Sequence, residues 1–187
     1  MFAAGSPRRV SPEQAATVQA GAPLSWVGVF ADQDPAEIAG LANRLQLSAV
    51  QLHGNESVET VAKVRAALPS SCEVWKAFPI TDSIPSRAAM SADRLLLDGG
   101  RSGRTLNQRQ GGWGVSFDWH LLDDYAGKDE VVLAGGLRAD NVARAAALET
   151  WALDVSSGVE SAPGEKDLTR LLEFFGERRR LPGRGTS

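Results

Sequence analysis

The sequence has little of the residues that build disulfide frameworks and metal centres. It contains one cysteine, Cys72, and two histidines, His53 and His120, among 187 residues. A single cysteine excludes an internal disulfide framework and fits a reducing compartment, so we expect a cytoplasmic protein. Two histidines do not suffice for a multi-histidine metal centre, and we predict no metal site.

Strong charge and long apolar runs are also absent. The formal net charge is −3, with 43% hydrophobic and 23% charged residues, values that are ordinary for a globular domain. No basic field covers the whole chain, and no apolar run approaches the length of a bilayer span. The first residues lack the pattern of a secretory signal. We therefore expect neither a nucleic-acid partner nor a membrane partner, and we interpret the basic tail at 178–187 as a solvated, flexible terminus.

What the sequence does contain is an alternation of apolar strands and helices. Ser11 with Gln14, and Asp34 before Pro35, are typical helix openings. Apolar strands between helices indicate a parallel sheet covered by helices, hence an α/β fold. Six strands suit an open, doubly wound sheet, whereas a closed barrel needs eight. The predicted strands are 26–30, 48–53, 73–78, 94–98, 131–134 and 151–155, and the main helices are 11–21, 34–45, 57–68, 140–149 and 166–181.

Two successive strand ends resemble the halves of a phosphate site. One strand ends in Gly135 and Gly136, and the next runs into Ser156, Ser157 and Gly158. In parallel βα barrels, the loops after the last two strands hold phosphate together with a helix N-terminus. A glycine pair after one strand is commonly only a tight turn, but the tandem arrangement favours an anion site and a barrel.

The spacing of apolar residues also predicts which helix faces are buried. One expected face carries Val58, Val61 and Ala62. In the last helix, the i, i+3, i+4, i+7 pattern of Leu168, Leu171, Leu172 and Phe175 predicts a second buried face. Residues 99–114 have no apolar periodicity, and we predict a long mobile loop there, in which the role of Trp113 stays open.

An ordered set of motifs then resembles the phosphoribosylanthranilate isomerase family. The resemblance runs from Phe2 to the last helix, and it is closest to the isomerase half of fused bacterial enzymes in which indole-glycerol-phosphate synthase precedes it. It implies a (βα)8 TIM barrel, with an isomerase domain over 1–177. The motifs are Ser6–Arg8, Val27–Phe30, Val50–Gly54, Leu96–Asp98, Phe117–Trp119, Leu133–Leu137, Asn141–Val142, Asp154–Glu160, Pro163–Gly164 and Lys166–Asp167.

The resemblance implies an enzyme of tryptophan biosynthesis. The family catalyses an Amadori rearrangement of a small phosphoribosyl substrate, N-(5-phosphoribosyl)anthranilate, and uses no metal or organic cofactor. It also implies a fused or associated indole-glycerol-phosphate synthase domain. An acid protonates the ring oxygen as the C1–O bond breaks, and a base then removes the C2 proton.

Residue by residue, the resemblance implies the following site. Asp98 matches the general acid, and Arg8 matches the arginine that holds the anthranilate carboxylate. Arg9 has no such match and is interpreted as a surface residue. The phosphate-binding positions are Gly135, Gly136, Ser156, Ser157 and Gly158.

Three further residues keep two interpretations each. His53 is either a substrate contact or a hydrogen-bonded structural histidine; with Glu56 it would make only a poor metal pair. Asp154 either touches substrate or caps its loop. Lys76 either lines the pocket or, more simply, buries its stem and reaches solvent.

The family's general base is a cysteine in a Lys-x-Cys-Gly motif, and this sequence has no such motif. We expect an incomplete barrel of about six βα units that lacks the first strand, the first helix and most of the second strand, so that activity of the chain alone is doubtful. Cys72 precedes its strand and is expected to be an inert thiol on the opposite face. The alternatives are a non-catalytic remnant that at most binds phosphate, or another phosphosugar isomerase or epimerase.

Overall fold

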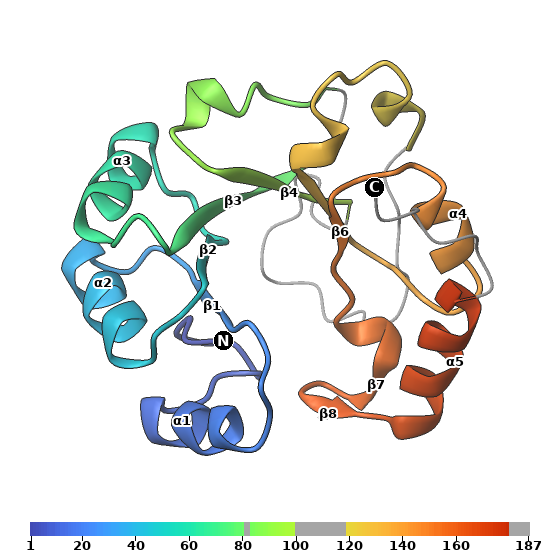
Figure 1. Cartoon of the computed structure of the whole chain (residues 1–187), viewed down its shortest axis with the longest axis horizontal. Coiled ribbons are helices and arrows are strands. Elements are labelled where there is room, and N and C mark those ends of the chain that lie inside the picture. Colours follow the sequence, from blue (N-terminus) through green and yellow to red (C-terminus); the bar gives the residue numbers. More distant parts are fainter. Residues whose placement is uncertain (81–82, 100–118, 180–187) are drawn as a thin grey trace. The chain divides into compact units, whose positions relative to one another are not determined.

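A computed structural model of the chain describes residues 1–80, 83–99 and 119–179. Strands and helices alternate along it, which confirms the α/β fold class (Figure 1). The chain divides into two compact units, the first formed by Met1–Phe78 with Pro85–Leu95 and the second by Pro79–Ile84 with Leu96–Ser187.

The first unit carries three helices whose starts agree with the sequence. It contains α1 (Pro12–Ala20), β1 (Val27–Phe30), α2 (Pro35–Arg44), β2 (Ala49–Leu52), α3 (Val58–Ala67), β3 (Glu73–Pro79), a 3-10 turn at Ala88–Met90 and the start of β4 (Arg94–Asp98). Ser11 and Gln14 form the predicted capping box, because each side chain accepts the other's backbone N–H, at 3.2 and 2.8 Å. Asp34 accepts the Ala36 N–H at 2.8 Å, so the start of α2 is also confirmed.

The six predicted strands form one sheet in chain order, β1-β2-β3-β4-β5-β6. In the first unit, β1, β2 and β3 are parallel, with Val27 opposite Ala49 and Ala49 opposite Glu73. Parallel pairing needs a crossover between successive strands, and α2 and α3 supply it. The side chains that follow β1, β2 and β3 therefore leave the sheet at the same edge.

Helices α2 and α3 lie side by side in the first unit (Figure 1). Ile38 of α2 and Val61 and Val64 of α3 are fully buried, and each such side chain contributes about 1.5–3 kcal/mol by leaving water. The prediction that Val58 and Ala62 share the buried face of α3 is wrong, since both are exposed. The buried row is Val61, Val64 and Leu68, because the helix is rotated toward α2.

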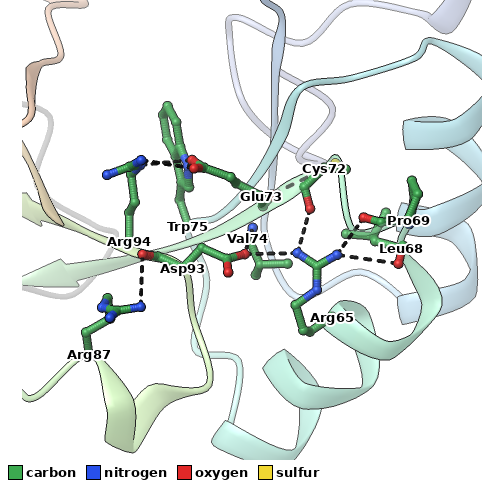
Figure 2. A network of polar contacts seen from close by, with 10 residues as sticks. All are labelled: Arg65, Leu68, Pro69, Cys72, Glu73, Val74, Trp75, Arg87, Asp93 and Arg94. Atoms are coloured by element: carbon green, nitrogen blue, oxygen red, sulfur yellow. Dashed lines mark hydrogen bonds and ion pairs between the residues drawn. The ribbon is translucent and has the colours of Figure 1, made fainter.

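A polar network joins the end of α3 to the starts of β3 and β4 (Figure 2). Arg65 donates to the carbonyls of Cys72 and Pro69, at 2.5 and 2.7 Å, and to the Asp93 carboxylate at 2.9 Å. The same carboxylate accepts the Val74 N–H at 2.7 Å. One arginine thus satisfies the carbonyls that a helix end and the following turn leave open.

The second unit differs more from the predictions. It contains the end of β4, 3-10 turns at Trp119–Leu122, Lys128–Glu130 and η4 (Ser157–Val159), and β5 (Val131–Ala134), α4 (Val142–Ala146), β6 (Ala152–Leu153), β7 (Glu160–Ala162), β8 (Glu165–Lys166) and α5 (Leu168–Arg179). Strand β6 and helix α4 are shorter than predicted. The antiparallel ribbon of β7 and β8 was not predicted at all.

The predicted buried face of α5 is also wrong. Leu168, Leu172 and Phe175 are exposed by 71%, 66% and 50%, whereas Phe174 is buried. Helix α5 packs against α4 and η4, and its covered side carries Phe174, which is buried, and Leu171, the one half-buried residue of the predicted face. Within-helix periodicity marks an apolar stripe, but the neighbouring elements decide which stripe is covered.

Three predictions lie outside the described residues. They concern the mobile loop at 99–114 from position 100 onward, the role of Trp113, and the flexible tail from position 180 onward. The predicted boundary between residues 177 and 178 stays a prediction.

Candidate active site

Asp98 and Gly135 are close neighbours in the second unit. Asp98 is the last residue of β4 and is half-buried, and its carbonyl accepts the Ile80 N–H at 3.2 Å. A Cβ atom placed on Gly135 would lie 2.7 Å from the Asp98 Oδ1 atom and 2.4 Å from the Gly99 nitrogen. The backbone of Gly135 therefore lies against the carboxylate, and the structure brings together two residues that the sequence had placed in one site.

The glycine loop, defined as Gly135–Leu137, has a backbone that favours glycine. Gly135 and Gly136 have φ values of 86° and 66°, in the left-handed region. Asn141 holds the loop at the start of α4: its Nδ2 donates to the Gly136 carbonyl at 2.9 Å, and its Oδ1 accepts the Arg138 N–H at 2.8 Å. Asn141 appeared in the sequence only as part of a motif, without a role.

The serine loop, defined as Asp154–Gly158, packs directly on the glycine loop. Asp154 follows β6, and its N–H donates to the Leu133 carbonyl of β5 at 2.8 Å. A Cβ atom on Gly158 would lie 1.8 Å from the Leu137 carbonyl oxygen, so only glycine fits there. Ser156 and Ser157 are exposed. The two predicted phosphate loops are thus neighbours, as the tandem of strand ends implied.

Two charged side chains, Lys166 and Glu160, hold the serine loop in place. The Lys166 Nζ donates to the Ser156 carbonyl and to the carboxylate of Glu160, both at 3.0 Å. The Glu160 side chain is only 3% exposed, and Arg170 donates to its carbonyl. Sequence reasoning missed this cluster. The signal was the Pro163–Gly164 turn, which marks a tight connection and here joins β7 to β8.

Arg8 and His53, the other predicted site residues, belong to the first unit. Arg8 is half-buried in the loop before α1, and its N–H donates to the Ser6 Oγ at 3.2 Å, whereas Arg9 is exposed. His53 follows β2 directly, and its N–H donates to the Phe30 carbonyl at 2.8 Å. Asp98, Asp154 and both loops belong to the second unit.

Lys76 behaves differently from the simpler of its two predicted roles. The interpretation that its ammonium reaches solvent is wrong: the side chain is 4% exposed, and Nζ lies 2.9 Å from the Glu56 Oε2 atom. Burial by itself raises the pKa of the Glu56 carboxyl. Hydrogen bonds from the Asp32 N–H and from Lys76 outweigh burial and hold that pKa below its ordinary value. Glu56 is therefore an ionised partner of Lys76.

Residues 1–80, 83–99 and 119–179 contain neither a cluster of metal ligands nor a membrane-spanning helix. No three His, Cys, Asp or Glu side chains gather there in a way that would hold a metal ion. No helix in these ranges has the length and apolar character needed to cross a membrane. Cys72 is buried at the start of β3, and burial raises the pKa of its thiol, so that it is protonated at neutral pH.

Residues 1–177 match the family described as N-(5'phosphoribosyl)anthranilate (PRA) isomerase. The chain belongs to this family. The resemblance noted in the sequence is therefore confirmed, and of the two architectures left open by the strand count, the barrel-family fold of the PRA isomerases applies.

Individual PRA isomerase relatives agree over nearly the whole chain. The Tryptophan biosynthesis protein TrpCF of Vibrio cholerae is 45% identical over 175 residues, which cover 94% of this chain and 36% of that protein. The chain thus spans about a third of the length of this relative. The crystal structure of phosphoribosyl anthranilate isomerase from Thermus thermophilus has a TM-score of 0.78 at 35% identity, covering 97% of this chain and 86% of its own.

A further solved PRA isomerase contains a ligand. It is described as a complex with reduced 1-(o-carboxyphenylamino)-1-deoxyribulose 5-phosphate. Its TM-score is 0.72 at 32% identity, with 96% of this chain and 85% of that chain covered.

Proposed function

We propose that this chain supplies the substrate-binding groups and the general acid of the PRA isomerase reaction of tryptophan biosynthesis. We also propose that the chain alone has little or no isomerase activity, because it lacks the Lys-x-Cys-Gly motif of the family's general base. The reaction is the Amadori rearrangement of N-(5-phosphoribosyl)anthranilate to 1-(2-carboxyphenylamino)-1-deoxyribulose 5-phosphate. The observation that supports it best is the contact between Asp98 and Gly135 in a member of this family. A carboxyl group beside a loop suited to phosphate is what a ring-opening step on a phosphosugar requires.

Asp98 is the proposed general acid. It gives a proton to the ribose ring oxygen while the C1–O bond breaks and the nitrogen lone pair forms the iminium. Asp98 is half-buried at the end of β4 and lies beside Gly135 of the proposed phosphate site, a position that suits this role. Removal of the C2 proton then leads to the ketone. We propose no residue of this chain as the base that removes the C2 proton, because the sequence has no Lys-x-Cys-Gly motif.

The two loops of the second unit are the proposed phosphate site. The backbone N–H groups of Gly135, Gly136 and Gly158 are the proposed donors, and Ser156 and Ser157 add exposed hydroxyl groups. Backbone N–H groups and hydroxyls are suitable donors for a phosphate. Neither a metal nor an organic cofactor is needed for this binding mode.

Arg8 is the proposed contact of the anthranilate carboxylate. A planar guanidinium such as that of Arg8 binds a carboxylate through two parallel hydrogen bonds. His53 is the proposed second contact, and Asp154 either contacts the ribulose chain or caps the serine loop. We also propose that the domain works beside an indole-glycerol-phosphate synthase domain, in line with the TrpCF name of its relatives.

Calorimetric titration with reduced 1-(o-carboxyphenylamino)-1-deoxyribulose 5-phosphate tests the proposal. We expect the chain to bind this compound more tightly than inorganic phosphate. Arg8→Met removes the guanidinium, and we expect affinity to fall roughly 10- to 100-fold, the effect of losing hydrogen bonds to a charged group. Arg9→Met is the matched control, because Arg9 is adjacent, exposed and without a proposed role.

Two results would count against this assignment. Equal affinity for the reduced compound and for inorganic phosphate would favour the alternative of a phosphate-binding remnant. An equal effect of Arg8→Met and Arg9→Met would remove Arg8 from the site.

A further inference from the structure

The pair formed by Lys76 and Glu56 is the most deeply buried charge pair among the ion pairs of the described residues. Their side chains are 4% and 1% exposed, and both belong to the first unit. Three backbone carbonyls also accept from the Lys76 Nζ: Gly54 at 2.8 Å, Ala77 at 3.1 Å and Leu52 at 3.4 Å. Removing two charges from water is unfavourable, and such pairs are often no more stabilising than apolar residues. We therefore expect the pair of Lys76 and Glu56 to act by fixing the groups that it contacts.

The contacts of the pair converge on the two peptide groups that flank His53. In the peptide group before His53, the Leu52 carbonyl accepts from Lys76, and the His53 N–H donates to Phe30. In the peptide group after it, the Gly54 N–H donates to both oxygens of Glu56 at 3.1 Å. The backbone of His53 is thus held from both sides by one charge pair.

The imidazole ring is held as well. The Gln51 Nε2 lies 2.8 Å from the His53 Nδ1, and Gln51 is 6% exposed. An amide nitrogen is a donor only, so the His53 Nδ1 accepts this hydrogen bond. The fixed peptide groups and this hydrogen bond together set the position of the ring at the carboxyl edge of β2.

We infer that Lys76 and Glu56 are positioning residues, which hold His53 in the place where its ring contacts the substrate. This inference rests on the proposed function, in which His53 is a substrate contact. Lys76 itself binds the backbone and not the substrate, because four oxygen atoms of the protein already surround its three N–H groups.

The test replaces the pair by uncharged residues of similar shape, Lys76→Met with Glu56→Gln. Affinity for the reduced deoxyribulose phosphate compound is expected to fall about tenfold, as for the loss of one hydrogen bond to a charged group. Affinity for inorganic phosphate, which reports on the second unit, should stay unchanged. The matched control is Glu59→Gln with Lys63→Met, an exposed pair of the same residue types on α3, and it should change neither affinity.

A cycle with His53→Ala separates positioning from general stability. If the pair acts through His53, its replacement in the His53→Ala background should cause no further loss of affinity. Nitrogen-15 NMR of the His53 ring gives a second readout: we expect unprotonated Nδ1 in the native chain and a mixture of tautomers in the double variant. Glu56→Asp keeps the charge but withdraws the carboxylate from Gly54, and it has the same expected effects if the double variant does not fold.

The outcomes are distinct. If the native chain does not bind the reduced compound, the proposed function fails, while the ring NMR still tests the positioning of His53. An unchanged ring spectrum in the variants would overturn the inference. So would a full tenfold loss in the His53→Ala background.

Discussion

Gly135→Ala should be among the most damaging single substitutions in the second unit. The new Cβ would lie 2.4 Å from the Gly99 nitrogen and 2.7 Å from the Asp98 Oδ1, distances that real Cβ atoms essentially never show. Because a backbone atom is one of these neighbours, no side-chain rotation relieves the overlap. Gly5 offers a matched control, since its φ of 77° resembles the 86° of Gly135 but no atom lies within 4 Å of its Cβ position.

The expected loss of stability has two parts. A residue other than glycine in the left-handed region costs about 1–2 kcal/mol, and Gly5→Ala should lose only this amount. Overlap in a packed site adds about 1–3 kcal/mol, so Gly135→Ala should lose about 2–5 kcal/mol of its free energy of unfolding. The difference between the two variants isolates the overlap.

Urea unfolding of both variants measures this difference, provided that the slopes with denaturant agree. Titration with the reduced deoxyribulose phosphate compound adds a functional readout, because the methyl group added to Gly135 would displace the Asp98 carboxylate and weaken binding. If the two variants lose the same free energy within about 0.5 kcal/mol, the close approach of Gly135 to Asp98 is wrong.

Three further changes test other parts of the structure. Arg65→Met should lose about 2 kcal/mol in urea unfolding because three short hydrogen bonds vanish, whereas the exposed Arg44→Met should lose less than about 1 kcal/mol; equal losses would contradict the network in Figure 2. Lys166→Met should weaken inorganic phosphate binding in calorimetry, because the serine loop loses its anchor; unchanged binding would exclude that role. Burial raises the pKa of Glu73, but the hydrogen bonds from Arg94 and Trp75 and the charge of Arg94 together outweigh burial and hold the pKa below its ordinary value of 4.5. The carboxylate therefore stabilises the fold above pH 4.5, and the stability advantage of the native chain over Glu73→Gln should shrink as the pH falls below that value.

The starts of α1 and α2 could be predicted from the sequence because capping is local. Ser11 and Asp34 contact backbone groups only two or three residues away. The six strands were predictable for a related reason, since continuous apolar runs between helices suit a parallel sheet. Residues close together in the sequence determine these features, and contacts with distant parts of the chain contribute little to them.

The site could be predicted only in part. Small residues after two successive strands indicated the two loops, and the resemblance to the family pointed to Asp98. The burial of Lys76 against Glu56 had no such signal, because twenty residues separate the partners along the chain. The contact of Gly135 with Asp98 likewise joins residues on different strands.

The sequence by itself thus determined the fold class, the family and the two loops after β5 and β6. Only the tertiary structure decided that Phe174 rather than Leu172 is buried, and that the ammonium of Lys76 never reaches solvent. The physical reason is the range of the forces involved. Caps and hydrogen-bonded turns depend on a few adjacent residues, whereas burial depends on which elements pack together after the whole chain has folded.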